Sequence, residues 1–148
     1  MAIDLSRLED SFLEEAAGHL VTMECLLLAL NIRRPDAKAL HAIFRAAHSI
    51  KGGAGAFGLV ALGDFTHELE SALDGLRNGE IDFTRSLIDL LLRSVDAGRL
   101  HVAALRRGEK GEDASFDAMK RELAAGVAQA RRIHDALGAP IAPPAGAR

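Results

Sequence analysis

Hydrophobic residues recur at intervals of three and four along most of the chain, which is the spacing that places them on one side of an α-helix. The pattern predicts five helices, which cover roughly residues 4–30, 36–55, 59–77, 84–107 and 114–137. No segment alternates apolar and polar residues with the period of two that a half-buried strand requires. The sequence therefore predicts an all-α fold.

Short polar or glycine-containing segments separate the predicted helices and offer capping side chains. Asp36 is placed to cap the second helix through its carboxylate. Asp82 and Thr84 are both candidates for the cap of the fourth helix, and Asp113 and Ser115 for the cap of the fifth. Short connections force successive helices to run antiparallel. We therefore expect an antiparallel four-helix bundle with a fifth, C-terminal helix alongside.

The first predicted helix carries a second apolar row. Its main stripe includes Leu5 and Leu8, whereas Val21, Cys25 and Leu28 lie on roughly the opposite side of the C-terminal half. We expect another helix to cover this row. The alternative is that the row is an exposed docking patch.

Length and composition are those of a single soluble domain. The chain has 148 residues, is 49% hydrophobic and 26% charged, and carries a formal net charge of −3, which gives no electrostatic reason to expect nucleic-acid binding. We expect residues 1–137 to form the domain, and residues 138–148, which are rich in proline, alanine and glycine, to be a linker. Cys25 is the sole cysteine, so no internal disulfide can form.

We also expect the chain to be cytoplasmic and not inserted in a membrane. The single cysteine suits a reducing compartment. The N-terminus lacks a basic segment followed by an apolar core, and no apolar run approaches the roughly 20 residues that a membrane span requires.

The least ordinary stretch is residues 46–58, which contains a histidine, a lysine and then four glycines within seven residues. Each glycine inside a helix costs about 0.5–1 kcal/mol relative to alanine, so their presence indicates that something must approach the helix closely. At about 100° per residue, His48 lies roughly 120° from the centre of the apolar stripe, with Lys51 and Gly52 one turn further on. The helix therefore presents a histidine to solvent, with a cation and a cleared surface beside it.

Residues 42–58 closely resemble the phosphoacceptor segment of histidine phosphotransfer (HPt) domains, and in particular the N-terminal domain of CheA-type chemotaxis histidine kinases. The similarity extends more weakly from Asp4 to about Leu137 and includes Thr66, His67 and Glu70. It implies an HPt-like four-helix bundle in which His48 accepts a phosphoryl group.

A histidine that accepts a phosphoryl group must be neutral, with one ring nitrogen free as the nucleophile and the other held as N–H by an acceptor. Glu70 is the candidate acceptor, because an adjacent antiparallel helix could bring it to His48. The resemblance implies the same role, in which the glutamate contacts one imidazole nitrogen and the other becomes phosphorylated. Taken without His48, Glu70 would be interpreted as a solvated surface carboxylate.

Lys51 and His67 are the other two polar candidates. Lys51 lies three residues beyond His48, shares its face of the helix and could neutralise phosphoryl oxygens. The resemblance makes this lysine part of the site, although its spacing alone also suits a solvated lysine. His67 could form a hydrogen bond to a residue that contacts the imidazole of His48, or it could be a surface residue.

Phe44, Gly52 and Gly55 would form a small, nearly featureless patch around the reactive ring. A response regulator must bring its aspartate within bonding range of the phosphorus, so we expect its surface to fit against this patch, with Phe44 as an anchor. The alternative is that Phe44 belongs to the core.

The sequence contains no Walker-type phosphate loop, no kinase glycine loop and no candidate site for ATP or Mg²⁺. We therefore expect the chain to receive and pass on phosphate without a cofactor of its own, which leaves open whether it counts as an enzyme by itself. The implied donor is the ATP-binding domain of a histidine kinase, which would hold Mg²⁺ and ATP. The implied acceptor is an aspartate of a CheY-like response regulator, which would hold Mg²⁺.

Two other classes of function compete with phosphotransfer. A metal-binding bundle could use His41, His48 and His67, but no histidine follows a glutamate at the Glu-x-x-His spacing of di-iron bundles, and Asp64 with His67 comes nearest. A non-catalytic helical adaptor is the second alternative, and it would leave the internal glycines unexplained.

Overall fold

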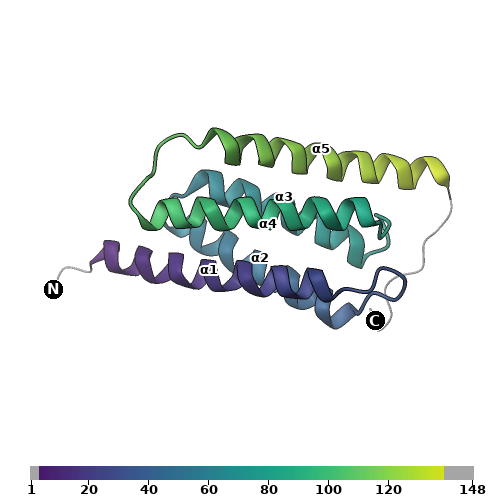
Figure 1. Ribbon diagram of the computed structural model, residues 1–148, viewed down its shortest axis with the longest axis horizontal. Helices are drawn as coiled ribbons and strands as arrows, with labels where there is room; N and C mark the ends of the chain where they lie inside the picture. Colours follow the sequence, from purple (N-terminus) through teal and green to yellow (C-terminus); the bar gives the residue numbers. More distant parts are fainter. Residues whose placement is uncertain (1–3, 139–148) are drawn as a thin grey trace.

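The computed structural model describes residues 4–138, and within this range the chain forms five α-helices and no strand (Figure 1). The helices are α1 (Leu5–Ala29), α2 (Ala37–Ala56), α3 (Val60–Arg77), α4 (Arg85–Arg106) and α5 (Ala114–Leu137). The prediction of an all-α fold is confirmed. The predicted linker, residues 138–148, lies outside the described residues apart from Gly138.

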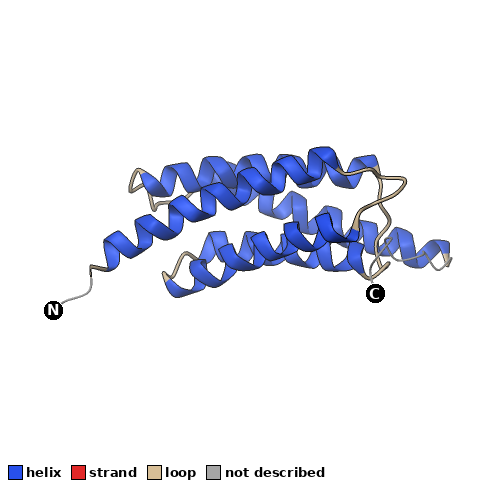
Figure 2. Ribbon diagram, turned by 90° about the horizontal axis from the view of Figure 1, so that it is seen from below, coloured by secondary structure: helices blue, strands red, loops and turns tan. Residues whose placement is uncertain are grey.

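The first four helices form an antiparallel bundle in which α1 packs against α2 and α4, and α2 packs against α3 (Figures 1 and 2). The fifth helix lies along α3 and α4 and makes no contact with α1 or α2. The expected four-helix bundle with a fifth helix alongside is therefore confirmed. This arrangement leaves the outer sides of α2 and α1 free of any other helix.

The core is built from the residues that the three-and-four spacing places on the inner faces. Phe116 anchors α5 to this core, because its ring lies 4.9 Å from the ring of Phe65 on α3, measured between centroids. Gly98 on α4 gives the Phe65 ring its space, since a Cβ atom at this position would lie 2.8 Å from the ring. Both aromatic rings are buried.

The capping residues resolve the alternatives that the sequence left open. Asp36, Thr84 and Asp113 each accept a hydrogen bond from a backbone N–H in the first turn of α2, α4 and α5, at 3.0, 3.1 and 3.0 Å. Asp82 is not the cap of α4. Its carboxylate instead lies 2.8 Å from Nδ1 of His134, so it ties the end of α5 to the connection between α3 and α4.

The first turns of α1 correct one expectation about the core. Leu5 and Leu8 belong to the apolar stripe of the sequence, yet their exposed fractions are 66% and 48%. The reason is that the N-terminal end of α1 extends beyond the neighbouring helices (Figure 1), so no partner faces these two side chains. Burial begins at Leu13.

The second apolar row of α1 is uncovered, and the prediction that another helix packs on it is wrong. Val21 and Leu28 have exposed fractions of 44% and 65%, and Cys25 is exposed as well. The fifth helix, which could have covered the row, packs on α3 and α4 instead, because Phe116 inserts there. Val21 lines a groove between α1 and α4 together with Leu100.

Candidate functional site

Helices α2 and α3 bring the principal candidates together because the chain reverses sharply between them. Gly58 has a φ of +67°, a left-handed conformation that glycine adopts without strain, and the N–H of Leu59 donates to the carbonyl of Ala54 at 2.8 Å. His48 and Glu70 lie at similar distances along the chain on either side of this turn. Antiparallel packing therefore places them side by side, although they are 22 residues apart.

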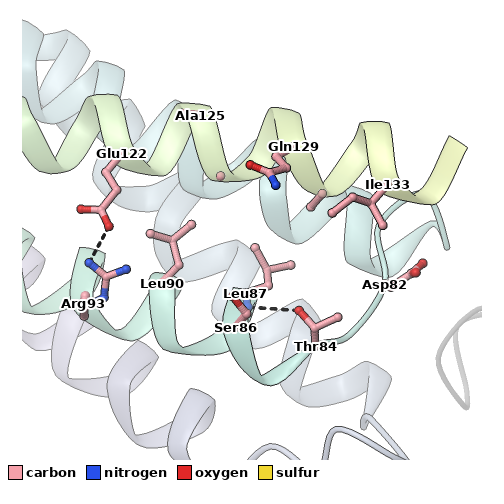
Figure 3. Close-up of a pocket in the computed structure, with 12 residues that line it drawn as sticks. Asp82, Thr84, Ser86, Leu87, Leu90, Arg93, Glu122, Ala125, Gln129 and Ile133 are labelled. Atoms are coloured by element: carbon pink, nitrogen blue, oxygen red, sulfur yellow. Dashed lines mark hydrogen bonds and ion pairs between the residues drawn. The ribbon is translucent and has the colours of Figure 1, made fainter. Parts of the chain in front are cut away.

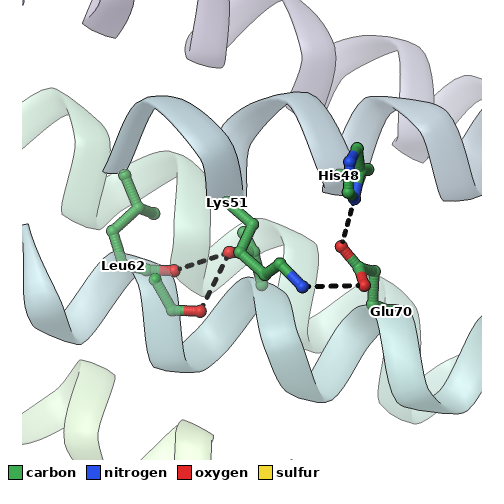
Figure 4. A network of polar contacts seen from close by, with 6 residues as sticks. His48, Lys51, Leu62 and Glu70 are labelled. Atoms are coloured by element: carbon green, nitrogen blue, oxygen red, sulfur yellow. Dashed lines mark hydrogen bonds and ion pairs between the residues drawn. The ribbon is translucent and has the colours of Figure 1, made fainter. Parts of the chain in front are cut away.

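The imidazole of His48 is held by Glu70 through one of its two nitrogens. Nδ1 of His48 lies 2.9 Å from Oε2 of Glu70 (Figure 4). A carboxylate can only accept a hydrogen bond, so Nδ1 must carry the hydrogen and Nε2 must carry the lone pair in the neutral ring. The side chain of His48 is 66% exposed, whereas that of Glu70 is 14% exposed. The contact with Glu70 thus fixes the tautomer of an imidazole that is exposed to solvent.

Lys51 completes this contact by binding the other oxygen of the same carboxylate. Its Nζ donates to Oε1 of Glu70 at 3.0 Å (Figure 4). Burial alone would raise the pKa of Glu70, but the hydrogen bonds from Lys51 and His48, together with the positive charge of Lys51, bring that pKa below its ordinary value of 4.5. Glu70 is therefore ionised at neutral pH, and Lys51 fixes the group that fixes the imidazole.

Two further histidines make the same kind of contact, and exposure separates them from His48. Nδ1 of His101 lies 3.0 Å from Asp113, and Nδ1 of His134 lies 2.8 Å from Asp82. The side chains of His101 and His134 are only 8% and 16% exposed. Of the three histidine–carboxylate pairs, the one that contains His48 is open to a reaction partner.

Phe44 lies beside the site, and the guanidinium of Arg77 lies over its ring. The Phe44 ring is nearly parallel to the His48 imidazole, at 10°, with 6.2 Å between centroids. The guanidinium carbon of Arg77 lies 4.4 Å from the centroid of the Phe44 ring. Phe44 is half-buried and packs against the core, so it combines features of the core and docking interpretations.

Arg77 is a neighbour of the site that sequence reasoning missed. It stands two turns beyond Glu70 on α3, and Phe44 stands one turn before His48 on α2. In an antiparallel helix pair, Arg77 and Phe44 therefore lie at the same end of the site. Their spacing from Glu70 and His48 could have identified Arg77 from the sequence.

The glycines of α2 divide into two groups. A Cβ atom at Gly52 or Gly55 would have no heavy atom of another part of the chain within 4 Å, so both leave open surface beside His48. A Cβ atom at Gly53 would instead lie 2.1 Å from the Phe12 ring. Gly53 therefore allows α1 to pack on α2, while Gly52 and Gly55 keep the surface near the imidazole bare.

Comparison with known proteins gives the family. A sequence model of the Hpt domain matches residues 7–132. The chain belongs to the Hpt domain family. The resemblance seen in residues 42–58 is thereby confirmed.

The relatives of this Hpt domain are chemotaxis proteins. Chemotaxis protein CheA of Salmonella typhimurium is 43% identical over 117 residues, which are 79% of this chain and 17% of the relative. Chemotaxis protein CheA of Klebsiella aerogenes is 38% identical over 144 residues, which are 97% of this chain and 22% of the relative. The Hpt domain thus spans about a fifth of the length of these relatives.

A solved structure shares the fold. It is the phosphorylated P1 domain of CheA3 in complex with CheY6 from R. sphaeroides, which superposes with a TM-score of 0.75 at 22% identity and covers 84% of this chain and 98% of that chain. At this identity the match establishes the five-helix fold of the Hpt domain and no more.

The structure does not bring His67 to the site of this Hpt domain. His67 is exposed and lines a polar groove between α3 and α5 with Asp64 and Lys120. Within residues 4–138 it forms no hydrogen bond to His48 or Glu70, so its position is that of the surface alternative. The buried hydroxyl of neighbouring Thr66 donates to carbonyls of its own helix, at 3.0 and 3.1 Å.

The metal-binding alternative gains no geometric support. The described part of the Hpt domain contains no group of three or more histidine, cysteine, aspartate or glutamate side chains that could share a metal ion. Nδ1 of His41 lies instead 3.4 Å from a guanidinium nitrogen of Arg77.

Across residues 4–138, no helix is long and apolar enough to cross a membrane.

A hollow also lies between α4 and α5, away from His48 (Figure 3). It has a volume of about 510 Å³, and its apolar lining includes Leu87, Leu90 and Ile133. An ion pair between Arg93 and Glu122, at 2.7 Å, crosses one end. No histidine or cysteine lines the hollow, and the histidine–glutamate pair is on other helices. The hollow therefore shares no residue with the contact between His48 and Glu70, which lies between α2 and α3.

Proposed function

We propose that Nε2 of His48 accepts a phosphoryl group from ATP bound to a histidine-kinase catalytic domain and passes it to an aspartate of a CheY-like response regulator. The observation that carries this proposal is the 2.9 Å contact between Nδ1 of His48 and an ionised Glu70, on an imidazole that is 66% exposed. The relatives support it, since they are chemotaxis CheA proteins. A protein of the same fold has been seen phosphorylated and in complex with CheY6.

In the first step the lone pair of Nε2 attacks the γ-phosphorus of ATP. A bond forms between Nε2 and phosphorus, the bond from phosphorus to the bridging oxygen breaks, and ADP leaves with the electron pair. The imidazole keeps its hydrogen on Nδ1 and becomes positively charged. Glu70 stabilises this charge because its carboxylate lies 2.9 Å from Nδ1.

In the second step a carboxylate oxygen of the response regulator attacks the same phosphorus. The bond between phosphorus and Nε2 breaks, and its electron pair returns to the ring, which is again neutral with the hydrogen on Nδ1. No proton has to enter or leave in either step. A rigid pair formed by His48 and Glu70 therefore serves both reactions without rearrangement.

ATP and Mg²⁺ belong, in this proposal, to the kinase catalytic domain, and a second Mg²⁺ to the response regulator. The kinase domain is either a further part of a longer polypeptide, as the greater length of the relatives suggests, or a separate protein. This chain contributes the phosphoacceptor and its positioning groups. We place the exchange in the cytoplasm.

The proposal is tested by labelling three proteins with a CheA kinase domain and ATP labelled in the γ-phosphate. The wild-type chain should gain a label that is lost in acid and survives in base, as a phosphoramidate does. His48→Gln should gain none. His41→Gln is the matched control, because His41 is also exposed on the same face of α2, two turns away, and this variant should be labelled normally. An acid-labile label on His48→Gln would contradict the proposal.

A further inference from the structure

The outer face of α2 carries positively charged side chains, and the helix itself contributes no carboxylate. The helix Ala37–Ala56 contains three cations, Lys38, Arg45 and Lys51, and no aspartate or glutamate, in a chain whose formal net charge is −3. Asp36 borders this face at the N-terminus of the helix, where its carboxylate caps the backbone. The charge of α2 is therefore opposite in sign to that of the protein as a whole.

Two of these cations are available to a partner. Lys51 is engaged with Glu70 at 3.0 Å. Lys38 and Arg45 are exposed, and neither forms an ion pair with any residue in the described range. No other helix covers them, because α2 contacts α1 and α3 only.

The two exposed cations lie on one side of His48 along α2, so the two halves of the face differ in charge. At about 100° and 1.5 Å per residue, Arg45 lies roughly 60° around and 4.5 Å along the helix from His48, and Lys38 roughly 80° around and 15 Å along. Both lie on the N-terminal side of His48 and turn away from Lys51. On the C-terminal side, Gly52 and Gly55 leave bare backbone. The imidazole of His48 thus lies between a basic half, formed by Lys38 and Arg45, and a flatter half in which Lys51 is paired with Glu70.

We propose that this basic half, formed by Lys38 and Arg45, docks the acidic rim of the response regulator's acceptor site. This inference rests on the proposed phosphotransfer function. An aspartate that accepts a phosphoryl group with Mg²⁺ needs further oxygen ligands, usually carboxylates, to hold the ion, so the rim of such a site is negatively charged. Lys38 and Arg45 complement that charge, and Gly52 and Gly55 accept a packed element of the regulator beside it.

Charge complementarity of this kind acts mainly on the rate of encounter and on orientation. Oriented charges raise association rates by about 10- to 1,000-fold at low salt, and the effect declines as ions screen it. Lys38 and Arg45 would therefore turn the regulator so that its aspartate faces Nε2 of His48. Neither cation takes part in breaking or forming a bond.

The test compares a double variant, Lys38→Gln with Arg45→Gln, with a control that loses the same charge on α5, Arg121→Gln with Arg132→Gln. Both control residues are exposed, and α5 makes no contact with α2. Each phosphorylated protein is mixed with Mg²⁺ and a CheY-type regulator that takes label from the wild type. Transfer from the α2 variant should be about tenfold slower at low salt and approach the wild-type rate at high salt.

Three results would overturn the docking proposal. The first is an unchanged transfer rate in the α2 variant, and the second is an equal loss in the α5 control. The third is an equal loss in the labelling of His48 by the kinase domain, which would assign the basic half to the kinase instead. Failure of the underlying function looks different, because the wild-type chain would then gain no acid-labile label at all.

Discussion

Replacing Glu70 by alanine removes the acceptor that fixes the His48 tautomer and balances the charge of the phosphorylated ring. A hydrogen bond to a charged group contributes about 1.5–3 kcal/mol when it is well shielded. Here one partner is 14% exposed and the other 66%, so the lower end of that range applies. If this energy is realised in the transition state, phosphorylation slows about tenfold, and loss of the counter-charge increases the effect toward a hundredfold.

The same substitution should change stability little. The contact between Lys51 and Glu70 joins side chains that are 34% and 14% exposed, and partly exposed ion pairs contribute about 0–1 kcal/mol. We therefore expect Glu70→Ala to remain folded, with an unfolding free energy within about 1 kcal/mol of wild type. Glu70→Gln, which keeps an acceptor oxygen but not the charge, should phosphorylate at an intermediate rate.

The pH dependence follows from the direction of the pKa shift. Because folding lowers the pKa of Glu70, its contribution to stability is present above its ordinary pKa of 4.5 and is lost as the pH falls through the lower pKa of the folded state. The difference in unfolding free energy between wild type and Glu70→Gln should therefore shrink in acid. Urea unfolding over a series of pH values measures it.

The kinetic assay is the initial rate of labelling by a CheA kinase domain with saturating ATP, with helicity followed by circular dichroism. Glu68→Ala is the matched control, because Glu68 is also on α3 but lines the polar groove toward α5. Its labelling rate should equal that of wild type. If folded Glu70→Ala were labelled as fast as wild type, Glu70 would not be the positioning group, and the reasoning from the 2.9 Å contact would be refuted.

Four further substitutions test the surroundings of His48. Phe44→Ala should slow transfer to the regulator more than phosphorylation by the kinase, and equal losses in a folded variant would count against docking at Phe44. Gly52→Leu should leave folding intact while slowing both partner reactions, because the new side chain covers the bare surface beside the imidazole; normal rates would show that no close approach occurs there. Gly53→Ala should destabilise the fold by about 1–3 kcal/mol, since its Cβ would meet the Phe12 ring at 2.1 Å, whereas Gly52→Ala should stabilise it by about 0.5–1 kcal/mol. Thermal unfolding of Gly53→Ala and Gly52→Ala measures the two changes in stability. If both variants were stabilised, or both destabilised, the packing of Phe12 against Gly53 would be contradicted.

The properties that the sequence determined by itself are those that depend on near neighbours along the chain. The three-and-four spacing sets which helices form, because residues three and four apart share one helix face whatever the rest of the chain does. The same rule places His48 on the side of its helix that faces away from the core, and it places Lys51 beside His48. Asp36 could be identified as a cap because capping involves only the residue and the first turn that follows it.

The tertiary structure decided which helix face meets which partner, since that depends on contacts between distant residues. The row of Val21, Cys25 and Leu28 is as apolar as a buried row, but it is exposed because Phe116 draws α5 onto α3 and α4. Asp82 has the chemistry of a cap, yet His134, 52 residues away, takes its carboxylate.

The site shows the same division. Residue types and the family resemblance single out His48 and Glu70, but their 2.9 Å contact exists because the turn at Gly58 sets the register between α2 and α3. That register also turns His67 toward α5 and stacks Arg77 on Phe44. A helical wheel fixes the direction of a side chain within its own helix. What that side chain touches depends on how far the neighbouring helix is shifted along it, and both the connecting turn and the packing of the whole bundle set that shift.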